Sequence, residues 1–416
     1  MFAYSFPPLA NAESIVTANI VRALEDWGWR SVVCTVRPGS HPGTKDIDLM
    51  DLLPSGLEVY RSTSLPGHKL TRVLRVLGLK RIALLVGSFP DESIFWYPGA
   101  LLTLNKILRK TKFALIQSRS FPITNHFLGL YAKTKSGLPW LVHFSDPWID
   151  SPFYSSAWTS VTRLHSRWER KIMETADIVT FTTEAARKHV MAKYPLVWQE
   201  KCHVIPHGFE TLSTKRAERA LLDSRYLNII YLGSFYGKRT PHSLFEGLRK
   251  YLTEFDRNPP IRIWLIGRMP HQSYANTVRN YGIENIVNLR HAVPYRKGLA
   301  YAQEADVLLT IDTQCENPDI FLQSKVIEYL GIKKPIWGIV FMSRANAALL
   351  QSFGCQVADI ESPSSIATSL RELVKKWQNG ELTVPDSERA EIQKYSLSNI
   401  TRNLASLLDA MIQIHS

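Results

Sequence analysis

The stretch D-I-F-L-Q-S-K-V-I-E-Y-L-G-I-K-K-P-I at residues 319–336 is the most informative part of this chain. It predicts the end of a loop, a helix that begins near Ser324 and is punctuated at Gly331, and a buried strand that opens at Pro335. A helix N-terminus carrying Ser324 and Lys325 offers backbone N–H groups, a hydroxyl and an ammonium to one anion, which suits a diphosphate. Glu328 lies one turn later on the same side, where a carboxylate can accept hydrogen bonds from a ribose. The alternative is that Ser324 only caps the helix while Lys325 and Glu328 are solvated.

Length and hydrophobic pattern predict an α/β protein with two domains. A chain of 416 residues is too long for one compact core, so we expect two domains of roughly 200 residues each. Buried apolar runs at residues 229–232 and 263–266 are separated by amphipathic segments, which is typical of strands alternating with helices. Residues 213–224 are rich in charge and lack a core pattern, so we place the domain boundary there.

The N-terminus and the cysteines indicate the cellular compartment. No basic region followed by an apolar core and a cleavage site opens the chain, and apolar stretches such as residues 82–86 are too short to span a membrane. The four cysteines are scattered without C-x-x-C spacing, which argues against a zinc site and a disulfide framework. We therefore expect a cytoplasmic protein. Because the chain begins unusually close to its first predicted strand, its start codon is open to question.

The formal net charge of +13 is unevenly distributed. Between residues 61 and 119 the acidic residues are Asp91 and Glu92, and the basic ones are Arg61, Lys69, Arg72, Arg75, Lys80, Arg81, Lys106, Arg109, Lys110, Lys112 and Arg119. Such a surface attracts an anionic partner.

A helix within this basic segment is amphipathic. Apolar residues recur at helical spacing from Leu70 to Leu77, while Arg72 and Arg75 fall largely on the other side, as in a helix lying on acidic lipid. The alternative is an ordinary surface helix with a basic outer face. Nucleic acid is not expected as a partner, because the chain has no zinc-finger spacing and no RNP-like aromatic motif.

Two strands of the first half carry the features that matter most for function. The chain opens with a predicted strand at residues 2–6, a helix at 14–27 and a strand at 31–36, with Ala10-Asn11-Ala12 where nucleotide-binding loops often carry glycines. A later strand at residues 140–144 ends in Ser145-Asp146-Pro147-Trp148. Ligands bind at the carboxyl ends of parallel strands, so Asp146 is a candidate for the reaction centre. The alternative is an aspartate that only initiates a turn before Pro147.

The second half repeats a strand that runs into a glycine. Residues 227–232 lead to Gly233 and then to Lys238 and Arg239, and residues 261–266 lead to Gly267. A glycine at a strand exit lets a phosphate approach the backbone, and the two bases supply charge against a diphosphate. The alternative is a surface turn with two solvated bases.

In this order and spacing, the segments resemble glycosyltransferase family 4, a large group of GT-B enzymes that use nucleotide-sugar donors. The matching pieces are F-P-P at residues 6–8, L-P-W-L-V-H-F-S-D-P-W at 138–148, A-D-I-V-T-F-T-T at 176–183, V-I-P-H-G-F at 204–209, Y-L-G-S-F-Y-G-K-R at 231–239, A-D-V-L-L at 305–309 and S-K-V-I-E-Y-L-G-I-K-K-P-I at 324–336. The resemblance covers nearly the whole chain.

The resemblance implies a GT-B fold, in which two Rossmann-like domains face each other across a central cleft. We expect an acceptor-binding domain at residues 1–210, a nucleotide-sugar-binding domain at 211–395, and a C-terminal helix at 396–416 that packs back on the first domain. Carried over from the family, the donor-binding residues would be Gly233, Lys238, Arg239, Gly267, Ser324, Lys325 and Glu328. Glu328 corresponds to the second glutamate of the family's E-x7-E pattern.

Two positions depart from the family pattern. Ile320 stands where the first glutamate is expected, so either Asp319, one residue out of register, or backbone groups would contact the transferred sugar. Ser145 replaces the histidine that precedes the family's aspartate. His143, two residues earlier and on the same side of the strand, is a substitute, and the alternative is a buried strand histidine with a local partner.

The resulting hypothesis is a retaining, metal-independent glycosyltransferase. It would move a sugar from a UDP- or GDP-linked donor to a saccharide or lipid-linked acceptor, and no further cofactor is expected. The basic first half would lie peripherally at the inner face of the cell membrane, as in cell-envelope polysaccharide or glycolipid biosynthesis. Asp46 and Asp48 have the D-x-D spacing of a metal-binding pair but lie in a remote loop, so no divalent ion is expected. A sugar-nucleotide epimerase of the same fold and an inactive nucleotide-binding scaffold remain as alternatives.

Overall fold

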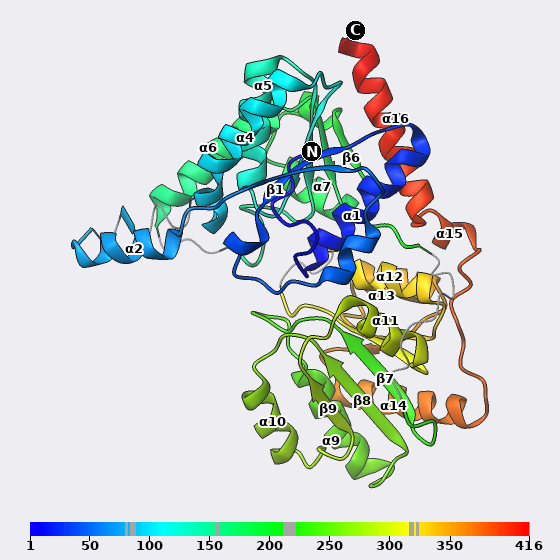
Figure 1. Cartoon of the computed structure of the whole chain (residues 1–416). Helices are drawn as coiled ribbons and strands as arrows, with labels where there is room; N and C mark the ends of the chain where they lie inside the picture. The colour runs from blue at the N-terminus through cyan, green and yellow to red at the C-terminus, as the bar shows by residue number, and fades with distance from the viewer. Residues whose placement is uncertain are drawn as a thin grey trace. The chain divides into compact units, whose positions relative to one another are not determined.

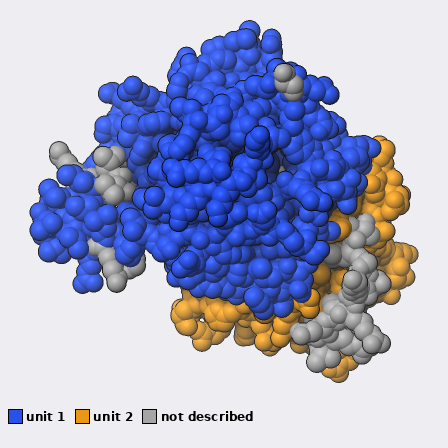
Figure 2. All heavy atoms as spheres, turned by 45° about the horizontal axis from the view of Figure 1, so that its top comes forward, with its two compact units in different colours: residues 1–207, 397–416 blue, residues 208–396 orange. Residues whose placement is uncertain are grey.

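The structure is a computed structural model of the whole chain, divided into two compact units (Figures 1 and 2). Unit 1 comprises Met1–His207 and Leu397–Ser416, and unit 2 comprises Gly208–Ser396. The residues that the structure describes are 1–79, 82–83, 89–154, 158–210, 222–315, 320–321 and 324–415. The predicted site residue Asp319 lies outside them, as do residues 213–221 of the predicted domain boundary at 213–224.

The sheet of unit 1 is parallel. Its strands are β1 (Val32–Val36), β2 (Glu58–Ser62), β3 (Ile116–Ser120), β4 (Trp140–Phe144), β5 (Ile178–Phe181) and β6 (Cys202–Val204). They pair as β1-β2 and as β3-β4-β5-β6, and Phe2 forms parallel bridges to both Cys34 of β1 and Ser118 of β3. With the N-terminal segment as the first strand, the order is 3-2-1-4-5-6-7, which is the 3-2-1-4-5-6 order of a Rossmann fold with β6 added at one edge.

The predicted first strand, residues 2–6, is shorter than expected. Phe2 and Ala3 donate to strand neighbours, with Phe2 N 2.8 Å from the Gln117 carbonyl and Ala3 N 3.1 Å from the Cys34 carbonyl. The Tyr4 amide donates instead to Oδ1 of Asn125, at 3.1 Å. A side chain thus takes the backbone donor that would have continued the ladder, and the strand prediction was too long.

Unit 1 also contains helices, most of which pack around its sheet, while the helix at Gly67–Val76 reaches away from it (Figure 1). The helices are α1 (Ala12–Leu24), α2 (Gly67–Val76), α4 (Tyr97–Lys110), α5 (Thr124–Ser136), α6 (Thr159–Thr175), α7 (Glu184–Met191), α8 (Leu196–Gln199) and α16 (Leu397–His415). The side chain of Asn11 caps α1 by accepting from the Ser14 amide at 2.9 Å, which explains how this loop starts a helix without glycine. No helix in the described part of the chain is long and apolar enough to cross a membrane.

Unit 2 repeats the same topology. Its strands are β7 (Leu227–Leu232), β8 (Ile261–Ile266), β9 (Val287–Arg290), β10 (Val307–Ile311), β11 (Ile336–Val340) and β12 (Gln356–Asp359), and its helices are α9 (His242–Glu254), α10 (His271–Asn280), α11 (Tyr295–Glu304), α12 (Ser324–Ile332), α13 (Ala345–Ser352), α14 (Pro363–Gln378) and α15 (Ala390–Gln393). The parallel strands follow the order β12-β11-β10-β7-β8-β9, which is again a Rossmann order.

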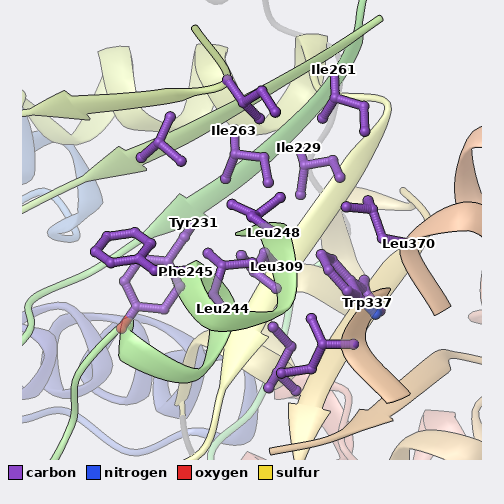
Figure 3. Packing of buried hydrophobic residues seen from close by; sticks show 14 of the residues in the cluster. Ile229, Tyr231, Leu244, Phe245, Leu248, Ile261, Ile263, Leu309, Trp337 and Leu370 are labelled. Atoms are coloured by element: carbon purple, nitrogen blue, oxygen red, sulfur yellow. The ribbon is translucent and has the colours of Figure 1, made fainter. Parts of the chain in front are cut away.

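Alternate residues of the unit 2 strands face opposite helical layers. On one face, Ile229 and Tyr231 of β7 pack with Leu244 and Leu248 of α9 and Leu370 of α14 (Figure 3). A second set of strand residues, including Ile230 and Leu308, packs against α12 through Ile327 and Leu330. Because both faces are covered, the strands read as continuous apolar runs, and this pattern made β7 and β8 predictable.

Helix α12 ends later than the sequence predicted. Gly331 does not end the helix, which continues to Ile332 and is followed by Lys333 at φ 58°. A Cβ atom at Gly331 would overlap the carbonyl oxygen of Glu210. This glycine therefore permits close approach of another backbone segment, and the left-handed residue after the helix is a lysine.

Candidate functional site

The topological switch point of unit 2 lies between β7 and β10. From these adjacent strands the chain continues toward opposite edges of the sheet. Open parallel sheets generally bind their ligands in a crevice at the carboxyl ends of such strands. Gly233 follows β7 directly, Asp312 and Thr313 follow β10, and α12 begins with Ser324. The sequence-predicted donor residues are therefore distributed around one edge of this sheet.

Gly233 and Gly267 bring two strand exits into close contact. The Gly233 amide donates to the Ile266 carbonyl at 2.9 Å, and the Gly267 amide donates to the Arg290 carbonyl at 3.1 Å. A Cβ atom at Gly267 (φ 157°) would overlap the carbonyl oxygen of Gly233. A side chain is therefore excluded at Gly267 by backbone atoms, which cannot move aside as a flexible side chain could.

Lys325 is the most unusual residue at this edge. Its Nζ lies 3.7 Å from the centroid of the Tyr231 ring and occupies the space that a Cβ atom of Gly233 would take. The ammonium group is buried and has no hydrogen-bond partner among the described residues. Burial, with a smaller effect of the nearby Arg239 charge, holds the pKa of Lys325 well below its usual value. The ring face and the nearby Glu328 charge provide some stabilisation, but no described residue forms a hydrogen bond with the ammonium.

Arg239, and not Lys238, is the base placed next to Lys325. Arg239 Nε donates to Oγ1 of Thr313 at 3.1 Å, so a residue after β10 fixes the guanidinium. The side chain of Lys238 is exposed, and its backbone carbonyl accepts from the Gln314 amide at 3.2 Å. The sequence left open which of the two bases faces the crevice, and the geometry favours Arg239.

The other residues predicted to bind the donor, Ser324 and Glu328, are on α12, and Ile320 precedes this helix. Ser324 is the first residue of the helix and is half-buried. Burial raises the pKa of Glu328, and the positive charge of Lys325 opposes that shift. Ile320 is 3% exposed and offers no polar group where the family pattern has a glutamate. Ser324, Lys325 and Glu328 thus lie on one short helix at the crevice.

In unit 1, His143 is a buried residue of β4. Its Nδ1 lies 2.9 Å from Oγ1 of Thr180 on the neighbouring strand. Burial, together with the charge of Arg119, lowers the pKa of His143 well below its usual value, so the ring is neutral. This arrangement is the one expected of a strand histidine with a local partner. Asp146 is half-buried in the turn after β4.

Sequence reasoning missed a charged pair in unit 1. Glu13, in the first turn of α1, lies 3.2 Å from Nε of Arg119 on β3 and accepts from the Ser145 hydroxyl at 2.8 Å. The sequence offered only a weak signal for Glu13, because an acidic residue in a first helical turn is equally explained by the helix dipole. Its two partners are distant in sequence, and no local pattern joins them.

The D-x-D sequence at residues 46–48 has a structural explanation. Asp46 precedes a 3-10 helix at Ile47–Leu52, and its Oδ1 accepts from the Asp48 amide at 3.1 Å. Within the described ranges, no group of three or more His, Cys, Asp or Glu residues is arranged to hold a metal ion. Asp46 thus acts as a helix cap in this loop.

Residues 14–208 match the family model described as "Glycosyl transferase 4-like domain". No match to the chain was found among curated proteins. HepE from Anabaena, solved in complex with UDP and glucose, is 14% identical, with a TM-score of 0.67 over 98% of each chain; the same protein has been solved with UDP-glucose. Sucrose-phosphate synthase from Thermosynechococcus elongatus is 15% identical, with a TM-score of 0.67 over 99% of this chain and 98% of that chain.

A third similar structure is WaaG, a glycosyltransferase involved in lipopolysaccharide biosynthesis. It is 13% identical, with a TM-score of 0.60 over 99% of this chain and 98% of that chain. These comparisons confirm the resemblance and the GT-B fold inferred from the sequence. Residues 14–208 therefore match a glycosyl transferase 4-like domain, and the chain has the GT-B fold of these structures.

Proposed function

We propose that this protein is a retaining, metal-independent hexosyltransferase that takes its sugar from a UDP- or GDP-linked donor. The acceptor is a saccharide or a lipid-linked saccharide of the kind used to assemble cell-envelope polysaccharide or glycolipid. The observation that carries the donor assignment is the buried ammonium of Lys325, which has no hydrogen-bond partner in the described part of the chain.

A diphosphate fits the surroundings of Lys325. The ammonium lies beside the backbone of Gly233, the guanidinium of Arg239 is close enough to affect its pKa, and α12 begins one residue earlier. An anion at this point would gain two cations and free backbone N–H groups of a helix N-terminus. Because the leaving diphosphate gains negative charge as the glycosidic bond breaks, these groups would stabilise the transition state more than the bound donor.

The other residues receive roles around this diphosphate. Glu328, one turn along α12 from Lys325, would accept hydrogen bonds from the donor ribose. The transferred sugar would contact Asp319 or nearby backbone groups, and Asp146 of unit 1 remains the candidate for the acceptor, since His143 is buried against Thr180. The UDP and UDP-glucose complexes of HepE support a uridine donor through the shared fold. WaaG, which is involved in lipopolysaccharide biosynthesis, supports a role in envelope glycolipid synthesis through the shared fold.

Nucleotide protection in thermal melts tests the donor assignment. UDP, GDP and ADP are added separately to the purified protein and to the variants Lys325→Met and Lys333→Gln, the second removing an exposed charge near the other end of α12. A nucleotide at a hundred times its Kd stabilises the folded state by about 2.7 kcal/mol. We expect protection of the wild type and of Lys333→Gln but not of Lys325→Met. Equal protection of all three proteins, or none of the wild type by any nucleotide, would overturn the assignment.

A lipid surface is the partner that best fits α2. Leu70, Val73, Val76 and Leu77 are 45–81% exposed, so the apolar stripe of this helix is not covered by the described part of unit 1. The helix reaches away from the sheet of its unit (Figure 1). Arg72 and Arg75 are also exposed and add positive charge, largely on the other side of the helix. An amphipathic helix with an uncovered apolar stripe and long arginine side chains suits the interface of an anionic membrane, which takes up both kinds of group.

Sedimentation with vesicles tests this surface. We expect binding to vesicles that contain phosphatidylglycerol, weakened by salt and by the double variant Arg72→Glu/Arg75→Glu, and little binding to phosphatidylcholine alone. The control Arg257→Glu/Lys375→Glu makes the same change in charge at exposed positions of unit 2. Equal binding to neutral vesicles, equal loss in the control, or dimerisation through α2 in place of lipid binding would contradict the proposal.

A further inference from the structure

The Glu13 carboxylate joins three elements at the topological switch point of unit 1. It projects from the first turn of α1, which follows the N-terminal strand segment. Arg119 comes from β3, the next strand of the sheet, and Ser145 follows β4 beyond it. Switch points are where open parallel sheets bind their ligands, so a charged group there belongs to the functional edge of the unit.

Three side chains of the described residues donate hydrogen bonds to this carboxylate. Oε1 lies 3.2 Å from Arg119 Nε and 3.2 Å from the Thr17 hydroxyl, and Oε2 accepts from the Ser145 hydroxyl at 2.8 Å. The side chain of Arg119 is 2% exposed and that of Glu13 is 17% exposed. A largely buried ion pair costs desolvation energy and often adds little to stability, which makes a role in placing groups the better explanation for its presence.

The surroundings make Glu13 the counter-ion of Arg119. Three histidines near this edge, the buried His126 and His143 and the half-buried His207, each have a pKa lowered by desolvation and, to a smaller extent, by the charge of Arg119. They are therefore neutral and add no charge to the pair. Removal of the Glu13 charge would leave the Arg119 guanidinium buried without this compensation.

Ser145 connects the pair to the predicted reaction centre. Its hydroxyl is held by Glu13, and its carbonyl accepts from the Thr182 hydroxyl at 2.9 Å, so both its side chain and its backbone are fixed. The next residue is Asp146. Ser145 stands where the family pattern has a histidine, and the hydrogen bond to Glu13 gives this serine a distinct structural role.

We propose that Glu13 is a positioning residue for the sugar transfer: through the Ser145 hydroxyl it fixes the turn that presents Asp146. The proposal rests on the proposed transferase function, because it assumes that Asp146 contacts the reacting groups. Misplacement of a reacting group by about 1 Å can cost on the order of 10²-fold in rate. Loss of the Ser145 hydroxyl therefore lowers kcat and leaves binding of the donor in unit 2 unaffected.

The test uses Ser145→Ala, which removes one donor to Glu13 and leaves the ion pair with Arg119 in place. The matched control is Tyr194→Phe, which removes a buried hydroxyl that donates to the Glu169 carboxylate at 2.7 Å in the same unit. For each protein, kcat and the KM for the nucleotide-sugar are measured, together with nucleotide protection in melts and hydrogen exchange of amides 145–150. The variant Glu13→Gln is measured alongside if it folds.

We expect Ser145→Ala to lower kcat on the order of 10²-fold, with KM and nucleotide protection unchanged and faster exchange at amides 145–150. Tyr194→Phe should keep the wild-type kcat. Unchanged kcat and exchange in Ser145→Ala, or an equal fall of kcat in Tyr194→Phe, would overturn the proposal. A third outcome separates the two proposals. If the wild type transfers no sugar but amides 145–150 exchange faster in Ser145→Ala than in the wild type, Glu13 positions the turn and the transferase function is rejected.

Discussion

Lys325 has a buried ammonium group that forms no hydrogen bond with any described residue, and these two properties conflict in a folded protein. Its Nζ is inaccessible and lies against Tyr231, and its pKa is held well below the usual value mainly by burial. An unpaired buried ammonium lowers the stability of the ligand-free protein. Such a penalty is retained when the group has a function, here the proposed capture of an anionic donor.

We therefore expect Lys325→Met to raise the stability of the ligand-free protein at pH 7 while it abolishes protection by nucleotide. Methionine keeps the length of the side chain and removes the charge, so the contact with Tyr231 remains. Urea unfolding of the wild type and the variant at pH 7 measures the difference. A variant that is clearly less stable than the wild type would show that the ammonium is already paired in the free protein.

The lowered pKa of Lys325 predicts that the free energy of unfolding depends on pH. The unfolded chain has a lysine pKa of about 10.4, above the folded value, so the unfolded state binds more protons between the two values. The destabilisation by Lys325 is therefore largest at low pH and disappears as the pH rises toward 10. We expect the stability difference between Lys325→Met and the wild type to shrink from pH 7 to pH 9.5, measured by urea unfolding. A difference that grows over this range would contradict the lowered pKa.

At the residue scale, the sequence predicted donor-side side chains but not the charged pair of unit 1. The sequence singled out Lys325 and Glu328 because they lie one helical turn apart at the start of a predicted helix. Glu13 and Arg119 are 106 positions apart, and their contact depends on the order of strands in the sheet. The choice of Arg239 over Lys238 likewise required the contact with Thr313.

At the scale of single elements, α11 and α12 offer a comparison between two helical glycines, Gly298 and Gly331. By helix propensity alone, glycine to alanine stabilises a helix interior by about 1 kcal/mol. At Gly331 the added Cβ would overlap the Glu210 carbonyl oxygen, whereas at Gly298 in α11 it would lie 3.8 Å from Val293. We expect Gly331→Ala to destabilise the protein by about 1–3 kcal/mol and Gly298→Ala to stabilise it slightly, both measured by urea unfolding. Equal effects of both variants would refute a close approach at Gly331.

The buried strands were the most predictable elements. The bounds inferred for β4, β7 and β8 agree with the structure, because continuous apolar runs between polar turns mark strands that are covered on both faces. The first strand was misjudged because Asn125 takes the Tyr4 amide, and the end of α12 because a glycine needed for packing resembled a helix stop. Both errors concern contacts with distant segments, which a local pattern does not contain.

At the scale of the whole molecule, the chain returns to its first unit. Helix α16 packs against α1, with Trp27 Nε1 3.2 Å from the Thr401 hydroxyl and Leu404 buried in the shared apolar cluster. We expect Leu404→Ala to destabilise unit 1 by about 2–5 kcal/mol, and Asn403→Ala, at an exposed position of the same helix, to have little effect. Hydrogen exchange of strands β3 to β5 measures the change. Unaltered exchange in both variants would refute a structural role for α16 in unit 1.

The central claim is that this GT-B protein transfers a sugar from a nucleotide donor to an acceptor. The most direct measurement incubates the purified protein with a panel of UDP- and GDP-sugars, with and without cell-envelope lipid extract, and follows both nucleotide release and the fate of the sugar. The account predicts release of one nucleotide that depends on the extract and is lost in Lys325→Met. Conversion of a donor into its epimer without acceptor, or no turnover of any donor in the presence of extract, would contradict it.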